Sequence, residues 1–270
     1  MNPVYINAIA ITGPGLPDWT ASVPVLKGDA HYSYAEPEKF TAAILSANER
    51  RRTTPLIRLA LQTAEQAMNM ATTNAVLGES GASQVACVFA SSDGDAEIID
   101  KICSALTLPD RPVSPTQFHN SVHNAPAGYW AIATQSRQPS SSISAGHYSF
   151  AVGLTEAATF AWITEIPILL VVYDLPAPFP LTELTGVTQA FACALLVSPQ
   201  QVANSLCRCR LSLVDAPADN CGNDALEFLR LSNPAARSLP LLEMIAAGQT
   251  GNVHLPYNEH NRLRAEISPC

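Results

Sequence analysis

The sequence has little positive charge. It holds 15 lysine and arginine residues against 23 aspartate and glutamate residues, a formal net charge of −8. The only basic cluster is the run of three arginines at residues 50–52, which we interpret as a solvated helix start. A nucleic-acid-binding domain concentrates lysine and arginine on one face, so nucleic acid is not an expected partner.

Long apolar runs are missing as well, and the first residues do not show the pattern of a signal peptide. The start, MNPVYINAIAIT, has neither the basic region nor the long apolar stretch of a signal peptide. Residues 151–172 are apolar overall, but Glu156, Glu165 and Pro167 divide this segment into shorter pieces. We therefore expect a cytoplasmic protein with reduced thiols and no membrane partner.

Cysteine spacing and nucleotide-binding motifs exclude further classes. The seven cysteines are odd in number and irregularly spaced, and Cys207 and Cys209 have no second pair at zinc-binding distance. Neither G-x-G-x-x-G nor G-x-x-x-x-G-K-[ST] occurs, so the Ser-Ser-Asp-Gly run at 91–94 is interpreted as a turn with a helix cap. No metal and no cofactor are predicted.

Alternating strand and helix patterns are what the sequence does contain. Apolar runs predict strands at 4–12, 84–90, 140–144, 166–173, 186–197 and 206–213, with two short ones near 253–255 and 263–267. Helical patterns lie at 17–27, within 32–52, from Pro55 onward, at 95–106, from about 120, from 147 or 148, and near 239–245. Because most strands are apolar at nearly every position, we predict an α/β fold. Its mostly parallel mixed sheet is covered by helices on both faces.

The most informative stretch is residues 115–157. A short strand at 140–144 turns at Ala145 and Gly146 into a helix, which places His147 at the positive end of that helix. Many enzymes present a nucleophile in such a turn. Here the presented side chain is an imidazole.

Two segments of this stretch resemble the beta-ketoacyl synthases of the thiolase-like group. Residues 122–128 (VHNAPAG) match the family's V-N-x-x-A-G, and residues 144–149 (SAGHYS) match the end of its T-A-C-[ST/A]-S strand, without a gap. His147 stands at the position of the catalytic cysteine. The chain length factors of type II polyketide synthases, which are relatives of the family, also lack this cysteine.

The resemblance covers about residues 4–215 and implies a thiolase-like layered fold, essentially one half of a ketosynthase. The family's later motifs, H-G-T-G-T and N-x-x-x-G-H-x-x-x-A, do not occur. We therefore expect residues 1–223 to form the ketosynthase-like half and residues 224–270 a short tail of one helix and two strands. His254 and His260 match neither motif and are expected at the surface.

Without the thiol and the two histidine motifs, the chain is not expected to be an enzyme on its own. The resemblance implies a non-catalytic, chain-length-factor-like subunit in a heterodimer with a full-length beta-ketoacyl synthase. It would shape that enzyme's acyl tunnel during polyene, polyketide or fatty-acid-like chain elongation. Truncated subunits of bacterial aryl polyene pigment pathways are similar. An acyl carrier protein would be met through the complex, and the arginines at 50–52 are an alternative contact for it.

The resemblance also implies positions for these contacts. The loop before the helix at about 120 corresponds to the segment that reaches into the partner's tunnel, and its residues are Thr116, Gln117, Phe118, His119, His123 and Asn124. The edge strand corresponds to the one that pairs antiparallel with the partner's, through Ser142, Ile143 and Ser144.

Other interpretations stay open. The chain can be an independent acyl-thioester hydrolase or acyltransferase that uses His147 or Ser149, although G-x-S-x-G is missing and Ser149 falls inside the helix. It can be a scaffold with no role in the tunnel. His119, His123 and His147 resemble a zinc triad, but His119 is followed by Asn120 rather than glutamate. The plainest expectation for His147 is a space-filling side chain with one hydrogen bond.

Overall fold

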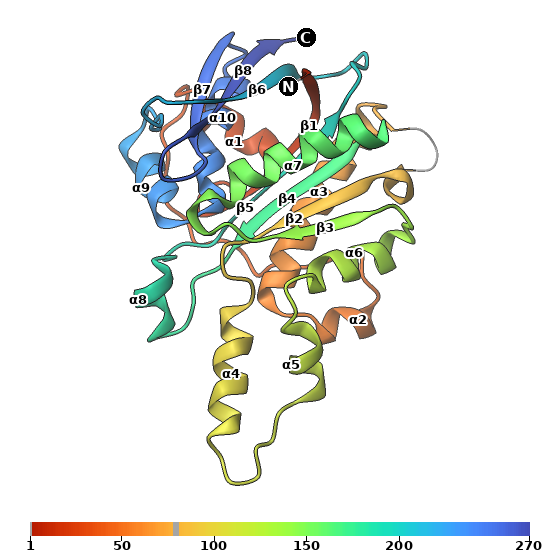
Figure 1. Ribbon diagram of the computed structural model, residues 1–270, viewed down its shortest axis with the longest axis vertical. Coiled ribbons are helices and arrows are strands. Elements are labelled where there is room, and N and C mark those ends of the chain that lie inside the picture. The colour runs from red at the N-terminus through yellow and green to blue at the C-terminus, as the bar shows by residue number, and fades with distance from the viewer. Residues whose placement is uncertain (1, 78–80) are drawn as a thin grey trace.

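One eight-stranded sheet organises the part of the chain that the computed structural model describes, residues 2–77 and 81–270 (Figure 1). Its strand order is β3-β2-β4-β5-β1-β6-β8-β7, so that β3 and β7 are the two edges. The strands are β1 Val4–Thr12, β2 Ala86–Ala90, β3 Ser140–Ile143, β4 Ile168–Asp174, β5 Phe191–Ser198, β6 Cys207–Val214, β7 Gly251–Pro256 and β8 Arg262–Pro269.

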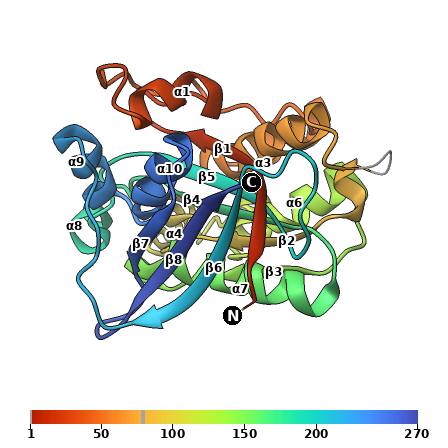
Figure 2. The same ribbon diagram turned by 90° about the horizontal axis from the view of Figure 1, so that it is seen from above.

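Helices cover both faces of the sheet at β1, β2, β4 and β5, as the apolar strands predict (Figure 2). In β6, β8 and β7 only alternate residues are buried, so these strands bury one face, and the prediction of two covered faces is wrong for them. Alternate residues of β4 enter different cores: Leu170 and Val172 pack toward α7, whereas Leu169 and Val171 pack toward α3. The helices are α1 Trp19–Leu26, α2 Ala47–Arg52, α3 Pro55–Thr73, α4 Ala96–Leu106, α5 Pro115–Asn120, α6 Ala125–Thr134, α7 Ser149–Thr164, α8 Leu181–Thr185, α9 Asp224–Ser232 and α10 Leu239–Ala246. None of the helices in these described residues combines the length and apolar character needed to cross a bilayer.

The predicted majority of parallel strand pairs is wrong. Only β2 is parallel to its neighbours, β3 and β4, and the other five pairs are antiparallel. The prediction took continuous apolar runs as a sign of parallel strands. Those runs report burial on both faces, and a covered antiparallel strand such as β5 is buried at every position as well.

Several predicted boundaries also need correction. Residues 32–42 form no helix, and the predicted helical region contains only the short α2. The helix expected from about 120 begins at Ala125, and the preceding loop contains the short helix α5. Gly186 ends α8 in a left-handed conformation, so β5 starts later, at Phe191. The strand at 140–144 and the helix from Pro55 are confirmed.

A two-helix arm formed by α4 and α5 projects from one end of the sheet (Figure 1). The arm buries little of itself: Ile98 is the only buried residue of α4, and Asn120 is the only one of α5. It leaves the sheet just after β2 and returns just before α6. Its direction therefore depends on contacts at these two attachment points.

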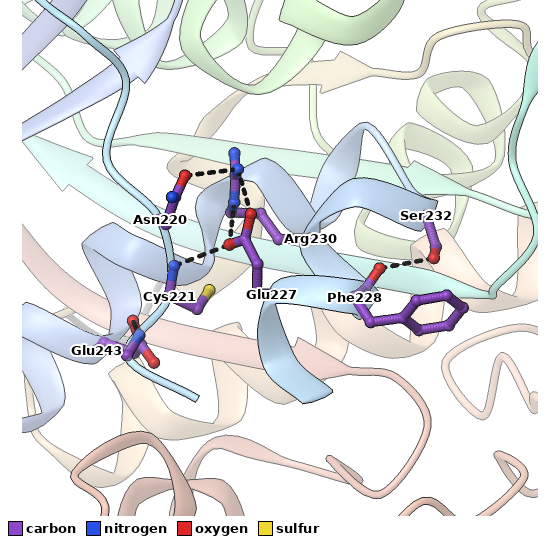
Figure 3. A network of polar contacts seen from close by, with 8 residues as sticks. Asn220, Cys221, Glu227, Phe228, Arg230, Ser232 and Glu243 are labelled. Carbon is purple, nitrogen blue, oxygen red and sulfur yellow. Dashed lines mark hydrogen bonds and ion pairs between the residues drawn. The ribbon is translucent and has the colours of Figure 1, made fainter. Parts of the chain in front are cut away.

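The tail from residue 224 belongs to the same sheet and core. β8 pairs with β6, α10 packs against α1, and the unpredicted α9 carries the buried residues Leu226 and Leu229. Arg230, 5% exposed at its side chain, pairs with Glu227 through both carboxylate oxygens (2.6 and 2.7 Å) and donates to Asn220 (Figure 3). Arg230 lowers the pKa of Glu227. The network anchors the tail to the preceding loop, and the division of the chain at residue 223 stays a prediction.

Candidate functional site

The turn at residues 144–149 has the expected strand–turn–helix form. After β3, Gly146 adopts a left-handed conformation (φ 54°), and residues Gly146–Tyr148 make one 3₁₀ turn that runs into α7. Glycine adopts this conformation without strain, which explains its place here. The turn thus presents residue 147 at the start of a sixteen-residue helix.

His147 is exposed, and its side chain makes no hydrogen bond or ion pair within the described residues. The expected space-filling role with one hydrogen bond is therefore wrong. A catalytic imidazole needs a neighbour that orients it and a group on which it acts. Among the described residues, neither forms a hydrogen bond or ion pair with His147.

Ser149 has a local structural role. It is fully buried, its hydroxyl donates to the Gly146 carbonyl oxygen (2.8 Å), and it accepts from the Ala145 amide (3.1 Å). These bonds close the turn at the helix start. A buried hydroxyl that is bonded in this way cannot reach a substrate, so the structure does not favour Ser149 as a nucleophile.

The six residues expected at the partner's tunnel lie in three places. Thr116 and Gln117 face a small cavity beside α4. Phe118, His119 and Asn124 line an open groove between α5 and α6. His123 is half-buried at the base of the arm, where Nε2 lies 3.3 Å from the Ser91 carbonyl oxygen. The residues therefore do not form one site, and Phe118 is the large apolar side chain among them that is free to enter another protein.

The groove between α5 and α6 is largely apolar and has a volume of 480 Å³. Phe118 is 67% exposed, Val122 51% and Ile132 61%, although all three side chains are large and apolar. The His119 ring stacks edge-on against Tyr129 at its floor, with ring centroids 6.3 Å apart. Neighbouring exposed apolar side chains of this size are typical of a surface that a partner covers.

The strand β3 leaves one side of its backbone open. It pairs with β2 only, and the Ser91 amide donates to the Ile143 carbonyl oxygen while the Cys87 amide donates to that of Pro139. By the alternation of a strand, the N–H and C=O of Ser142 point away from β2. The edge position predicted for Ser142 and Ile143 is confirmed, whereas Ser144 lies in the turn after β3; the pairing of this edge with a partner stays a prediction.

A buried carboxyl lies where β2 and β4 end. Asp174, the last residue of β4, is 2% exposed, and its Oδ1 accepts from the Ser91 hydroxyl, the Ser92 amide and the Ser92 hydroxyl (2.8, 2.8 and 2.9 Å). Burial raises the pKa of Asp174 to about 7, against the opposing effect of these hydrogen bonds. The cluster joins the sheet to the base of the arm.

The three histidines considered as zinc ligands lie in three different places. His119 lies in the groove, His123 contacts the end of β2, and His147 is exposed on the turn. Within residues 2–77 and 81–270, no three histidine, cysteine or acidic side chains come together as metal ligands. Cys207 and Cys209 do share one face of β6, and both pack into the apolar core.

Sequence reasoning missed Val122, Ile132 and Asp174. Val122 precedes α6 and Ile132 lies within it, and only the fold brings the two side chains to one groove. Asp174 left a signal, because a carboxylate directly after the apolar run ILLVVY marks the carboxyl end of a strand. Such ends collect functional polar groups in α/β sheets.

The sequence matches the family model described as beta-ketoacyl synthase, N-terminal domain, over residues 27–253. A search of the curated proteins found no match. The matched segment starts later than the predicted resemblance and extends through α9 and α10 into β7. A model of the N-terminal domain agrees with the expectation that the chain corresponds to one half of a synthase.

Three solved structures share the fold. One chain of the complex of the ketosynthase ApeO with its chain length factor ApeC from Xenorhabdus doucetiae has 22% identity and a TM-score of 0.71, covering 97% of this chain and 98% of that chain. A chain of the ishigamide ketosynthase/chain length factor has 14% identity and a TM-score of 0.72 (100% and 99%). A chain of AntDE:AntF, a type II polyketide synthase ketosynthase with its acyl-carrier protein, has 13% identity and a TM-score of 0.75 (100% and 99%). The predicted thiolase-like layered fold is thereby confirmed.

Proposed function

The chain belongs to the beta-ketoacyl synthase family, and from this premise we propose that it is a chain-length-factor-like subunit without catalytic activity of its own. It pairs with a full-length beta-ketoacyl synthase and shapes the acyl tunnel of that enzyme. The observation that carries the proposal is the exposed His147, at the position where the family resemblance expects the acyl-accepting cysteine; it forms no hydrogen bond or ion pair with any described residue. An imidazole without an orienting group does not replace a thiolate that must hold a growing acyl chain.

Two features of the surface support a heterodimer. The open edge of β3 offers unpaired backbone groups to an added strand, and an uncovered edge is a liability in an isolated protein. The groove with Phe118, Val122 and Ile132 offers apolar area beside it, because α6 packs against both β3 and β2. Pairing would satisfy the strand edge and cover the groove at the same time.

Phe118 is the residue we assign to the partner's tunnel. It lies on α5 of the projecting arm and is 67% exposed, so it can enter a neighbouring subunit without rearrangement of this chain. A phenyl ring at the end of a tunnel limits the length of the acyl chain that fits. The products are expected to be unsaturated chains of the polyene or polyketide type, carried by an acyl carrier protein that binds the heterodimer.

Co-expression with a neighbouring full-length ketosynthase tests the proposal. We expect the two chains to co-purify, the complex to elongate carrier-bound acyl chains, and this chain alone to show no covalent acyl group. In the complex, Phe118→Ala should shift the products to longer chains. Ile163→Ala is the matched control, since Ile163 is 75% exposed near the end of α7 and outside the groove. Unchanged product lengths in an intact Phe118→Ala complex would leave only a scaffolding role, and an acylated single chain would contradict the proposal altogether.

A further inference from the structure

The direction of the two-helix arm is set by few contacts. Apart from Ile98 and Asn120, α4 and α5 bury no residue, so apolar packing holds the arm weakly. On the returning side, Asn120 donates to the Arg52 carbonyl oxygen (2.6 Å) and accepts from the Tyr129 hydroxyl (3.1 Å). On the departing side, Asp95 caps α4 through the Ile98 amide. Between these contacts and the sheet lies the turn at residues 91–94.

Asp174 organises this turn. One carboxylate oxygen accepts three hydrogen bonds from Ser91 and Ser92, and the Ser91 hydroxyl in turn accepts from the Gly94 amide (3.0 Å). The Ser92 carbonyl oxygen accepts from the Ser144 hydroxyl (2.6 Å), which belongs to the turn after β3. His123, from the returning side of the arm, completes the arrangement at the Ser91 carbonyl oxygen. Both attachment points of the arm thus meet at the residues that Asp174 binds.

The backbone of Asp174 is held by hydrogen bonds, as its side chain is. Its carbonyl oxygen accepts from the Asn233 side chain (3.0 Å), which also donates to the Gln189 carbonyl oxygen (2.7 Å). Its own strand pairs with β2 on one side and β5 on the other. Asp174 therefore connects a rigid part of the molecule with the base of a weakly held one.

The contacts also indicate that one proton is shared between Asp174 and Asp93 through the Ser92 hydroxyl. The Ser92 hydroxyl lies 2.9 Å from Asp174 Oδ1 and 2.8 Å from Asp93 Oδ2, but it has one hydrogen to donate. Two ionised carboxylates would leave one of these short contacts without a hydrogen. Within the described residues, no lysine, arginine or histidine forms an ion pair with Asp174, and its Oδ2 has no hydrogen-bond partner. Burial, which raises its pKa, agrees with a held proton.

We propose that Asp174 is a positioning residue that fixes the direction of the α4–α5 arm and thereby sets how far Phe118 reaches into the partner's tunnel. The first half of this inference stands on the contacts of this chain. The second half rests on the proposed function. Asp174 itself touches neither the groove nor the edge strand, so its effect on the products passes through the arm.

Two native cysteines allow the arm to be measured directly. Cys103 lies on α4 and Cys270 at the end of β8, and these are the two exposed cysteines among the described residues. Spin labels on both, with mass spectrometry to verify two labels per chain, report the distance from the arm to the body. We expect the same narrow distance distribution for the wild type and Asp174→Asn, because asparagine keeps the accepting oxygen in a neutral side chain. Asp174→Ala, which removes the acceptor, should at least double the width of the distribution.

The variants decide the assignment in each outcome. A folded Asp174→Ala chain with the wild-type distribution would overturn it, and so would Asp174→Asn with a distribution as broad as that of Asp174→Ala. Should Asp174→Ala fail to fold, the double variant Ser91→Ala with Ser92→Ala keeps the carboxyl and removes both hydroxyl donors. It should broaden the distribution to an intermediate width, and an unchanged width would again overturn the assignment. Asp110→Asn is the matched control, on an exposed residue of the segment between α4 and α5, and should change nothing.

Product lengths separate this inference from the proposed function. In the complex with the ketosynthase, Asp174→Ala should shift the mean product length by at least one extension unit, in step with Phe118→Ala. A broadened distance distribution with unchanged products in both variants would leave the positioning role and remove the tunnel role. Altered products in Phe118→Ala alone, with no change of the arm in Asp174→Ala, would leave the tunnel role and remove the positioning role.

Discussion

The two edges of the sheet are treated in opposite ways. At β3, the N–H and C=O of Ser142 face outward with no strand beside them. At β7, Asp219 takes the place of a neighbouring strand: its side chain accepts from the His254 amide (2.8 Å), and its own amide donates to the His254 carbonyl oxygen (2.9 Å). Asp219 Oδ2 also lies 3.3 Å from His254 Nδ1.

This difference supports the β3 side as the surface that takes part in the proposed heterodimer. A sheet edge must be paired, covered or charged to prevent uncontrolled strand addition. The chain closes the β7 edge with its own loop and leaves the β3 edge, beside the apolar groove and the arm, unprotected. The three predictions that follow test this contrast, beginning with the largest effect.

The open side should respond to pH, because Asp174 is buried there. Its pKa is about 7 in the folded state, above the ordinary value of 3.8, so the folded chain binds more protons between these values than the unfolded chain does. The free energy of unfolding should therefore fall as pH rises from about 4 to 7 and level off above, by roughly 2–4 kcal/mol from this group. Asp174→Asn carries no titrating proton and should lack this part of the decline.

Denaturant unfolding of both proteins at several pH values measures this effect. Other acids, such as the half-buried Glu243, also have a raised pKa, so the difference between the two curves is the quantity to compare. Parallel curves for the wild type and the variant would contradict the prediction. Hydrogen exchange should localise the change to β2 and β4 rather than to β7 and β8.

Proline at the open edge should weaken the heterodimer. Ser142→Pro removes an outward N–H and leaves the β2 ladder in place, so it should cost the complex one hydrogen bond and leave a partner group unpaired. That loss is about 1–3 kcal/mol, or roughly 10- to 100-fold in affinity. Titration of the ketosynthase against the labelled chain measures it.

Asn252→Pro is the matched control at the closed edge. Since the His254 amide points outward to Asp219, the amide of Asn252, two residues earlier on β7, also points away from β8. This variant should bind the ketosynthase as the wild type does. Equal loss of affinity in both variants would mean that β3 has no special role.

Removal of Asp219 should open the closed edge. Asp219→Ala leaves the His254 amide without its acceptor, which should lower the free energy of unfolding by about 1 kcal/mol. The larger expected effect of this variant is self-association, because β7 then exposes unpaired backbone groups. Sedimentation at increasing protein concentration should show dimers or larger species in the variant. A strictly monomeric variant would show that Asp219 does not guard this edge.

Local sequence patterns predicted many of the helices and strands but not how these elements pack together. Pro55 after Thr54 marked the start of α3, and Thr54 does cap that helix through the Ile57 amide. The helical prediction for residues 32–52 was largely wrong. Apolar residues such as Tyr32 and Leu45 lie in an irregular segment and are buried without forming a helical face. α9 was missed, although Asn223 caps it and its two buried leucines, Leu226 and Leu229, are three residues apart.

The same distinction applies to the candidate site, where local segments could be predicted and contacts between distant segments could not. The turn that presents His147 and the edge strand beside it could be predicted, because a strand end, a glycine and a helix start are adjacent in the chain. The groove could not, since Phe118 and Ile132 meet only after α5 and α6 have packed.

The sequence alone determined that the central strands are buried on both faces, that a turn presents residue 147, and that this residue cannot serve as a thiol nucleophile. These properties depend on residue type and on neighbours within a few positions. Tertiary structure decided the strand directions, which edge is closed and what Asp174 holds. Each of these depends on hydrogen bonds between residues far apart in the chain, such as those of β1 with β5 and β6, of Asp174 with Ser91, and of His254 with Asp219. No local pattern encodes which distant group will meet a given donor, because the packing of the whole sheet brings the two together.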